Sequence, residues 1–286
     1  MSIRINPAKC ISYWSFGYIP SGRIVRDLYR RLVGTPNLAK RVQAPSIIEA
    51  LNLKEDESCV DLGCGSGYIT IELAKICREA VGIDVNPNIA NNVIPDSLRG
   101  KLRYLVQDAR SIPLPSCSVD VVLCSEVLQM IPKPDEFLIE IHRILKPDGR
   151  IVVISGIGHP AIKSAYQNNS ALLRVAKKLY PQSIPSSYDA YVAALTNSFE
   201  SAFVFPEPDY YPNLVSQNSF AVTRTSYAPS SQAFGLISWL QFFQFIRKGS
   251  TIPNFTFFSF MAASVLNQFK SAGCGGGQIV QANKCE

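Results

Sequence analysis

Histidine is scarce in this chain, and the cysteines are not arranged as metal-binding cysteines usually are. There are two histidines, His142 and His159, and the eight cysteines contain no Cys-x-x-Cys pair. Zinc and iron–sulfur sites are usually built from such pairs or from clustered histidines. A disulfide framework is also not expected, because such frameworks are typical of small secreted chains. We therefore expect no metal and reduced thiols that pack as small apolar groups.

Long apolar runs and long basic runs are also missing. No uninterrupted apolar stretch approaches the roughly 20 residues that a membrane-spanning helix needs, and residues 1–7 lack the apolar core of a signal peptide. The net charge is +6, with lysines and arginines scattered along the chain. Because no basic run is interleaved with aromatics, nucleic acid is not expected as a partner. These absences predict a cytoplasmic protein with no stable membrane anchor.

A glycine-rich turn is the most informative feature that is present. Residues 59–68 read CVDLGCGSGY, so an apolar run ends at Asp61 and is followed by Gly63, Gly65 and Gly67. Glycine permits a tight turn from a strand into a helix and the close approach of a ligand to bare backbone, and the start of a helix offers unpaired N–H groups. The apolar spacing over 68–78 predicts the helix. The turn therefore predicts a ligand site, and the following segments indicate which ligand it holds.

Four further apolar segments predict strands after this turn. They cover residues 80–84, 102–107, 119–124 and 150–154. Between the last two, residues 137–145 have the spacing of a helix with one apolar face, and the turn 146–149 closes that helix. Short strands that alternate with helices predict a Rossmann-like, doubly wound α/β fold with a mostly parallel sheet.

Carboxylates follow three of the predicted strands. Asp61, Asp84 and Asp108 each stand at a strand end, and Asp84 lies about 20 residues beyond the glycines, where nucleotide-binding sheets place the acid that binds ribose hydroxyls. Because ligands bind outside the carboxyl ends of parallel strands, these acids are expected along the ligand-binding edge. Each acid could also cap a helix or pair with a lysine.

Taken together, these segments resemble the class I S-adenosylmethionine-dependent methyltransferases, and especially the broad group that contains quinone- and sterol-methylating enzymes. The resemblance covers roughly residues 45–156. It rests on the order and spacing of several short motifs, namely VDLGCGSG (60–67), GID (82–84), QDA (107–109), IPL (112–114), SVDVV (118–122) and EIHRILKPDG (140–149).

The resemblance implies a role in cofactor binding for individual residues. Asp61 and the turn residues Gly63, Cys64, Gly65 and Gly67 would surround the methionine part of the cofactor. Asp84 would bind the ribose diol, and Val85, Asp108 and Ala109 would lie beside the adenine. Ser125 and Glu126 would face the methyl donor.

A dinucleotide is the main alternative ligand for the turn. Its usual fingerprint is G-x-G-x-x-G, but here the third glycine comes one position early and Tyr68 occupies the expected place. Asp61 also disfavours a pyrophosphate, because like charges repel, whereas it suits a ligand that carries an ammonium and a sulfonium. The sequence therefore favours S-adenosylmethionine over NAD.

The remaining segments divide the chain into four parts. We expect a helical cap over 1–44, the cofactor-binding core over 45–156, an inserted substrate-binding lid over 157–253 and a return to the core over 254–286. Long ordered segments after the fifth strand lie over the carboxyl edge of the sheet, where they usually bind substrate. The insert is poor in charge and rich in Phe and Tyr, which predicts an acceptor with considerable apolar area.

The end of the chain shows one strand, over 278–281, whereas the resembled fold closes with two antiparallel strands. The second strand either comes from the insert, over 220–223, or belongs to a longer natural chain. In that second case the protein would be fused to a further domain.

Residues that act on the acceptor are not identified by any pattern. His159 follows the fifth strand and Glu126 the fourth, so these two are the candidate catalytic residues, while His142 within its helix is interpreted as structural. A base is needed for a phenol, an alcohol or a ring carbon, but not for a carboxylate. A carboxylate acceptor would instead require a cation in the pocket, for which the candidates are Arg26, Arg30, Lys163, Arg174 and Arg224.

These features predict methyl transfer from S-adenosylmethionine, with S-adenosylhomocysteine as product, to an oxygen of a specialised metabolite. The acceptor is expected to be a small molecule or a modified peptide that presents a hydroxyl or a carboxylate. One alternative is C-methylation of a quinone or isoprenoid ring, which requires a base in the pocket. Another is a protein that binds S-adenosylmethionine without catalysis.

Overall fold

The computed structural model describes residues 38–92, 94–156, 160–179, 184–190, 193, 206–228 and 277–285. The chain falls into two compact units. One unit contains residues 43–156, 207–226 and 277–286 and holds the sheet; the other contains residues 1–42, 157–206 and 227–276 and holds helices α6 (Pro160–Gln167) and α7 (Ala171–Leu179). Most of the expected cap over 1–44 lies outside the described residues.

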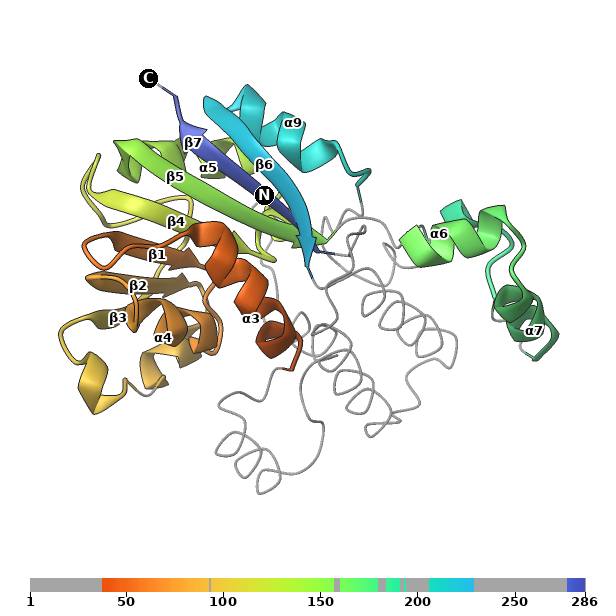
Figure 1. The fold of residues 1–286 in the computed structure, drawn as a ribbon, viewed down its shortest axis with the longest axis horizontal. Helices are drawn as coiled ribbons and strands as arrows, with labels where there is room; N and C mark the ends of the chain where they lie inside the picture. Colours follow the sequence, from red (N-terminus) through yellow and green to blue (C-terminus); the bar gives the residue numbers. More distant parts are fainter. Residues whose placement is uncertain are drawn as a thin grey trace. The chain divides into compact units, whose positions relative to one another are not determined.

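A seven-stranded sheet forms the centre of the first unit (Figure 1). Its order is β3-β2-β1-β4-β5-β7-β6. The first five strands run parallel and β7 pairs antiparallel with β5. The strands are β1 (Ser58–Leu62), β2 (Glu79–Asp84), β3 (Leu102–Val106), β4 (Val119–Ser125), β5 (Leu145–Gly156), β6 (Phe220–Ala228) and β7 (Gly277–Lys284).

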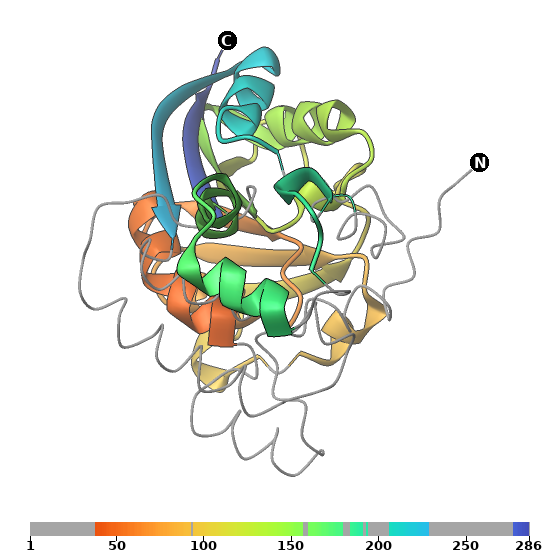
Figure 2. The same ribbon diagram turned by 90° about the vertical axis from the view of Figure 1, so that its right-hand side faces the viewer.

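Helices cover both faces of this sheet, as Figures 1 and 2 show. On one face lie α3 (Leu38–Leu51) and α4 (Tyr68–Ala74), and on the other lie α5 (Pro134–Ile144) and α9 (Tyr210–Gln217). Three short 3-10 helices, η2 (Pro87–Asn91), η3 (Asp96–Leu98) and η4 (Leu128–Met130), belong to the connections. The predicted doubly wound α/β fold is confirmed.

The central strands are buried as the apolar runs predict. Every residue of β1 is buried, and so is every residue of β4 except Asp120. Parallel strands covered on both faces read as continuous apolar runs, because both sides of the strand meet helices. Helix α5 places Phe137, Leu138, Ile141 and Ile144 in the core.

Residues 207–226 lie with the sheet, although the sequence analysis placed them inside the inserted lid over 157–253. Strand β6 begins at Phe220, so the second closing strand comes from the insert, which was one of the two possibilities considered. Its neighbour β7 separates it from β5, and the side chain of Thr223 donates to the backbone oxygen of Gln281 at 3.1 Å. The other predicted boundaries stay predictions.

Two local expectations differ from the structure. The helix expected over 68–78 ends at Ala74, and turn residues precede β2. Strand β5 already begins at Leu145, which pairs with Val119, while Arg150 pairs with Val121. The expected turn over 146–149 therefore becomes an irregular segment inside the strand, because five steps on β5 match two on β4.

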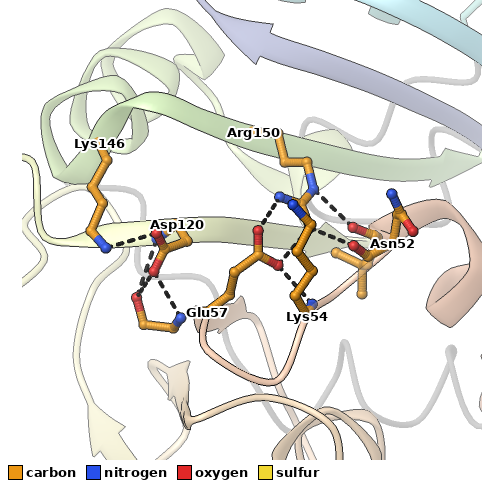
Figure 3. A network of polar contacts seen from close by, with 8 residues as sticks. Asn52, Lys54, Glu57, Asp120, Lys146 and Arg150 are labelled. Carbon is orange, nitrogen blue, oxygen red and sulfur yellow. Dashed lines mark hydrogen bonds and ion pairs between the residues drawn. The ribbon is translucent and has the colours of Figure 1, made fainter.

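A polar network ties α3 to the amino ends of the central strands (Figure 3). The guanidinium of Arg150 donates to both carboxylate oxygens of Glu57, at 2.7 and 2.8 Å, and to the backbone oxygens of Leu51 and Asn52. Those carbonyls end α3, where backbone acceptors lack partners within the helix. Nearby, Lys146 donates to Asp120 at 2.7 Å. The network lies at the end of the sheet opposite to the predicted ligand edge.

Replacing Arg150 by alanine is expected to lower the free energy of unfolding by about 2 to 4 kcal/mol, since charged hydrogen bonds and helix-end contacts are lost together. Arg99→Ala is the matched control, because Arg99 and Asp96 form an ion pair whose side chains are 77% and 87% exposed. Denaturant titration of both variants measures the difference. Equal stability of the two variants would show that the Arg150 contacts contribute nothing.

The Arg150–Glu57 pair also gives this prediction a pH dependence. The hydrogen bond from Arg150 holds the pKa of the Glu57 carboxyl below its usual range. Its stabilisation is therefore full above the unfolded-state pKa, about 4.3, and is lost as the pH falls through the lower folded-state pKa. The stability difference between wild type and Glu57→Gln should accordingly disappear in acid.

None of the described helices has the length and hydropathy that a membrane span needs. Within the same described part of the chain, no three His, Cys, Asp or Glu side chains come together in a way that could hold a metal ion.

Candidate functional site

Glycine is needed for different structural reasons at the three glycine positions of the turn after β1. All three have positive φ angles: 70° at Gly63, 53° at Gly65 and 73° at Gly67. A Cβ on Gly63 would collide with Val127, and one on Gly67 would collide with the ring of Tyr104. A Cβ on Gly65 would meet nothing within 4 Å among the described residues. Gly63 and Gly67 therefore serve the packing of the turn, whereas Gly65 presents bare backbone to open space.

The peptide groups of Gly65 are held from the next strand and the loop after it. Its N–H donates to Oδ2 of Asp84 at 2.9 Å, and its carbonyl accepts from the side-chain amide of Asn92 at 3.1 Å. The other oxygen of Asp84 accepts from the N–H of Asn86, also at 2.9 Å. The structure thus joins the predicted glycine turn and the predicted ribose acid at one edge of the sheet.

Asp61 lies beneath the turn rather than on its surface. Asp61 is only 3% exposed, and its carboxylate oxygen Oδ2 accepts a hydrogen bond from the hydroxyl of Thr70 at 2.7 Å. Burial, with the neighbouring charges of Asp61 and Asp84, raises the pKa of the Cys64 thiol, so the thiol stays neutral. The turn therefore carries the negative charge of two carboxylates and no thiolate.

The two predicted adenine contacts beyond Asp84 differ in what they offer. Val85 is 59% exposed, an unusual position for an apolar side chain, and it directly follows the ribose acid. Asp108, by contrast, forms an ion pair with Arg110 at 2.6 Å, which lowers the pKa of its carboxyl. Its neighbour Ala109 is half-buried. Val85 therefore offers a free apolar surface, whereas Asp108 also serves to fix Arg110.

The segment after β4 lies against the glycine turn. Val127 fills the space beside Gly63 and thereby places Ser125 and Glu126 next to the turn. Glu126 adopts a φ of 61°, unusual for a residue with a side chain, while its N–H donates to the carbonyl of Ile154 at 2.6 Å. The side chain of Gln129 donates to its carboxylate at 2.7 Å. Because β1 and β4 are neighbours, the structure brings the predicted donor-facing residues to the cofactor turn.

The motif 140–149 has a structural task. Glu140 accepts from the N–H of Ile112 at 2.7 Å, and Arg143 donates to the carbonyls of Ile112 and Leu114 at 2.9 Å. These bonds fix the loop that follows Asp108. His142 lies 3.1 Å from the carbonyl oxygen of Cys285, in line with its interpretation as structural.

Four residues of the site escaped the sequence analysis. Thr70 and Asn92 bind Asp61 and Gly65, and their residue types alone carry no signal for those roles. Tyr104 donates to the carbonyl of Gly67 at 3.3 Å and occupies the space beside Gly82, its partner across β2 and β3. The small Gly82 opposite the large Tyr104 is the sequence signal for this packing, but it can be recognised only when the strand register is known. The fourth residue is Val127, which packs beside Gly63.

The other candidate base, His159, lies outside the described residues, as do Arg26 and Arg30. Among the remaining candidate cations, Arg224 is exposed on β6 of the sheet unit, while Lys163 and Arg174 belong to the other unit. In that unit, Tyr166 of α6 donates to the carbonyl of Pro185 at 2.9 Å, and Lys177 lies 5.4 Å from the centre of its ring.

Comparison with known proteins identifies relatives of the sheet unit. Residues 60–153 match the family described as "Methyltransferase domain". The sterol 4-C-methyltransferase strm-1 of Caenorhabditis elegans is 30% identical over 111 residues, which cover 37% of this chain and 33% of that protein. The demethylmenaquinone methyltransferase of Lactobacillus johnsonii is 29% identical over 161 residues, covering 53% and 65%. The chain thus spans one third to two thirds of the length of these relatives.

A solved structure extends the likeness to most of the chain. The geranyl diphosphate C-methyltransferase of Streptomyces coelicolor, in complex with Mg2+, geranyl-S-thiolodiphosphate and S-adenosyl-L-homocysteine, superimposes with a TM-score of 0.57. The alignment covers 94% of this chain and 84% of that one at 16% identity. At this identity the likeness concerns the fold.

Proposed function

We propose that this chain transfers the methyl group of S-adenosylmethionine to an oxygen of a partly apolar specialised metabolite, because residues 60–153 match the family described as "Methyltransferase domain". The observation that carries the proposal is the turn at Gly65, where bare backbone faces open space and Asp84 holds the peptide from below. A turn built only for the chain reversal would not need this opening.

The residues present fit S-adenosylmethionine. Asp84 would hold the ribose diol, as acids at the end of the second strand do in nucleotide-binding sheets, and exposed Val85 would contact the adenine. Asp61 and the turn would surround the methionine part, whose ammonium and sulfonium are attracted by carboxylates. A pyrophosphate bound at the turn would meet Asp61 with like charge. The chemistry of the site therefore supports the sulfonium cofactor over a dinucleotide.

The cofactor supplies an electrophilic methyl group, so the protein's task is to place a nucleophile in line with it. Ser125 and Glu126 lie beside the turn and would face that methyl group. The half-buried Glu126 carboxylate is the group proposed to accept the proton that a hydroxyl acceptor releases. His159 is proposed as a further contact to the acceptor, since it follows β5 closely in the sequence.

The lid expected over 157–253 and the cap expected over 1–44 are proposed to bind the acceptor. Residues 157–206 and 227–253 supply many aromatic side chains and little charge. Such a lining suits a small molecule or a modified peptide with considerable apolar area.

C-methylation of a quinone or isoprenoid is a second candidate, and the names of the relatives favour it. The sterol relative is named as a 4-C-methyltransferase. A ring carbon needs a base to become nucleophilic, and Glu126 would then take that role. A protein that binds the cofactor without turnover remains a third alternative, which predicts binding but no product.

Calorimetric titration of the purified chain with S-adenosylmethionine, S-adenosylhomocysteine and NAD tests the proposal first. We expect micromolar binding of the first two and none of NAD, because Asp61 beneath the turn repels a pyrophosphate. Incubation with methyl-labelled S-adenosylmethionine and with catechol, menadiol or a fatty acid then separates hydroxyl, ring-carbon and carboxylate acceptors. Binding of NAD alone would contradict the proposal, whereas cofactor binding without label transfer to any probe would favour the third alternative.

A further inference from the structure

Three polar side-chain atoms are buried together at the carboxyl end of β5. They are the hydroxyl oxygens of Ser155 and Tyr211 and the amide oxygen Oε1 of Gln278, and none makes a hydrogen bond of normal geometry to the described residues. The three residues are at most 1% exposed. We call these three residues the polar cluster. Buried polar groups are nearly always paired, so three unpaired atoms in one place require an explanation.

Three different elements bring the polar cluster together. Ser155 of β5 and Gln278 of β7 are direct partners across the antiparallel pair, so their side chains share one face of the sheet. Tyr211 comes from α9, which covers that face. The side chain of Gln278 is fixed to the start of α9, because its Nε2 donates to the carbonyl oxygen of Pro208. This bond pairs the amide nitrogen of Gln278 and leaves its amide oxygen Oε1 without a hydrogen bond.

The polar cluster offers both hydrogen-bond donors and an acceptor. Burial raises the pKa of the Tyr211 phenol, and the nearby Glu126 carboxylate raises it further, while a weak hydrogen-bonding interaction with the Ser155 hydroxyl lowers it. The phenol therefore stays protonated at neutral pH and can donate. Ser155 can donate or accept, and Oε1 of Gln278 can only accept.

The position of the polar cluster connects it with the methyl acceptor. Tyr211 is close enough to Glu126 for the two to interact electrostatically, and Glu126 lies beside the glycine turn. Leaving a buried donor or acceptor unpaired costs about 1 to 3 kcal/mol for each group. A chain that carries three such atoms at its ligand-binding edge gains when a ligand atom pairs with them.

We propose that Ser155, Tyr211 and Gln278 form a binding site for one neutral hydroxyl group of the methyl acceptor, an inference that rests on the function proposed above. The hydroxyl accepts from Tyr211 and donates to Oε1 of Gln278, and Ser155 completes its coordination. A carboxylate does not fit, because it would face the Gln278 oxygen and the charge of Glu126. The polar cluster therefore selects hydroxyl-bearing acceptors over carboxylates.

Three bicyclic probes test this site directly: 1-naphthol, naphthalene and 1-naphthoate, each titrated against the full chain by fluorescence, with and without S-adenosylhomocysteine. In the wild type we expect 1-naphthol to bind about tenfold more tightly than the other two, because only it pairs with the buried groups. Tyr211→Phe should abolish this preference, and Ser155→Ala should reduce it. Tyr210→Phe is the matched control, since Tyr210 is the exposed neighbour on the same helix.

The melting temperature separates a ligand site from a structural one. Without probe, Tyr211→Phe should melt at the wild-type temperature or slightly above it, because the removed hydroxyl makes no hydrogen bond of normal geometry. A fall of several degrees would mean that a permanently bound water pairs the polar cluster, and it would overturn the proposal. Equal binding of 1-naphthol and naphthalene by the wild type, or binding of neither, would overturn it as well.

Failure of this site and failure of the proposed function are distinguishable. Calorimetry with S-adenosylmethionine reports on the glycine turn, and the naphthol preference without cofactor reports on the polar cluster. If the wild-type protein binds the cofactor but shows no preference for 1-naphthol, only the proposed hydroxyl site is contradicted. If it prefers 1-naphthol but binds no cofactor, only the proposed methyltransferase function is contradicted.

Discussion

Gly65→Val is expected to weaken S-adenosylmethionine binding about a hundredfold or more, equivalent to about 3 kcal/mol, while the domain stays folded. The new side chain would point into the open space beside the turn and would occupy the volume proposed for the cofactor. The substitution also strains the backbone, because a φ of 53° is unfavourable for a β-branched residue. Calorimetry measures the loss of affinity, and thermal unfolding measures the strain.

Gly100→Val is the control that separates strain from steric exclusion. Gly100 has a φ of 83°, and a Cβ there likewise meets nothing within 4 Å of the described part of the chain. It lies just before β3, at the opposite end of that strand from the ligand-binding edge. Both variants should lose similar stability, and only Gly65→Val should lose affinity. An equal loss of affinity in both would mean that general destabilisation, and not occupied space, explains the effect.

Asp84→Ala is expected to abolish the thermal shift that S-adenosylmethionine gives to the wild type. Two charge-assisted hydrogen bonds to the ribose diol would be lost, each worth about 1.5 to 3 kcal/mol, so the affinity should fall at least about a hundredfold. The fold should persist with some loss of stability, because the N–H groups of Gly65 and Asn86 also lose their acceptor.

Two further substitutions make the Asp84 experiment decisive. Asp84→Asn keeps an oxygen for one of the two N–H groups and should restore part of the stability but little of the affinity. Asp96→Ala removes an exposed carboxylate from the neighbouring loop and should change neither property, since its side chain is 87% exposed. Full cofactor affinity in Asp84→Asn would show that the carboxylate only shapes the turn.

The fold was largely predictable because its signals are local. Apolar runs that end in Asp61, Asp84 and Ser125 mark buried parallel strands, and the glycines mark the turn. The strand register could not be predicted from the sequence. The packing of Tyr104 against Gly82 could therefore not be predicted either, because it depends on that register. The sheet assignment of residues 220–228 was equally uncertain, because their pairing depends on β7 from far along the chain.

The candidate site was predictable where a role needs a particular residue type, as at Gly65 and Asp84. It was not predictable where a generic residue acts through position. Ser155 and Gln278 carry no motif, and only the antiparallel pairing of β5 with β7 places them opposite each other. Tyr211 carries no motif either, and only the structure shows that it lies on α9 and is buried.

The strand order β5-β7-β6 also delays completion of the sheet while the chain is being synthesised. The five parallel strands are complete once residue 156 has left the ribosome, but β7 begins only at residue 277, roughly 120 residues later. At translation rates of about 5 to 20 residues per second, the apolar edge of β5 waits about 6 to 24 seconds for its neighbour. Unpaired strand edges of this kind invite aggregation, so the nascent chain depends on whatever shields β5 during that interval.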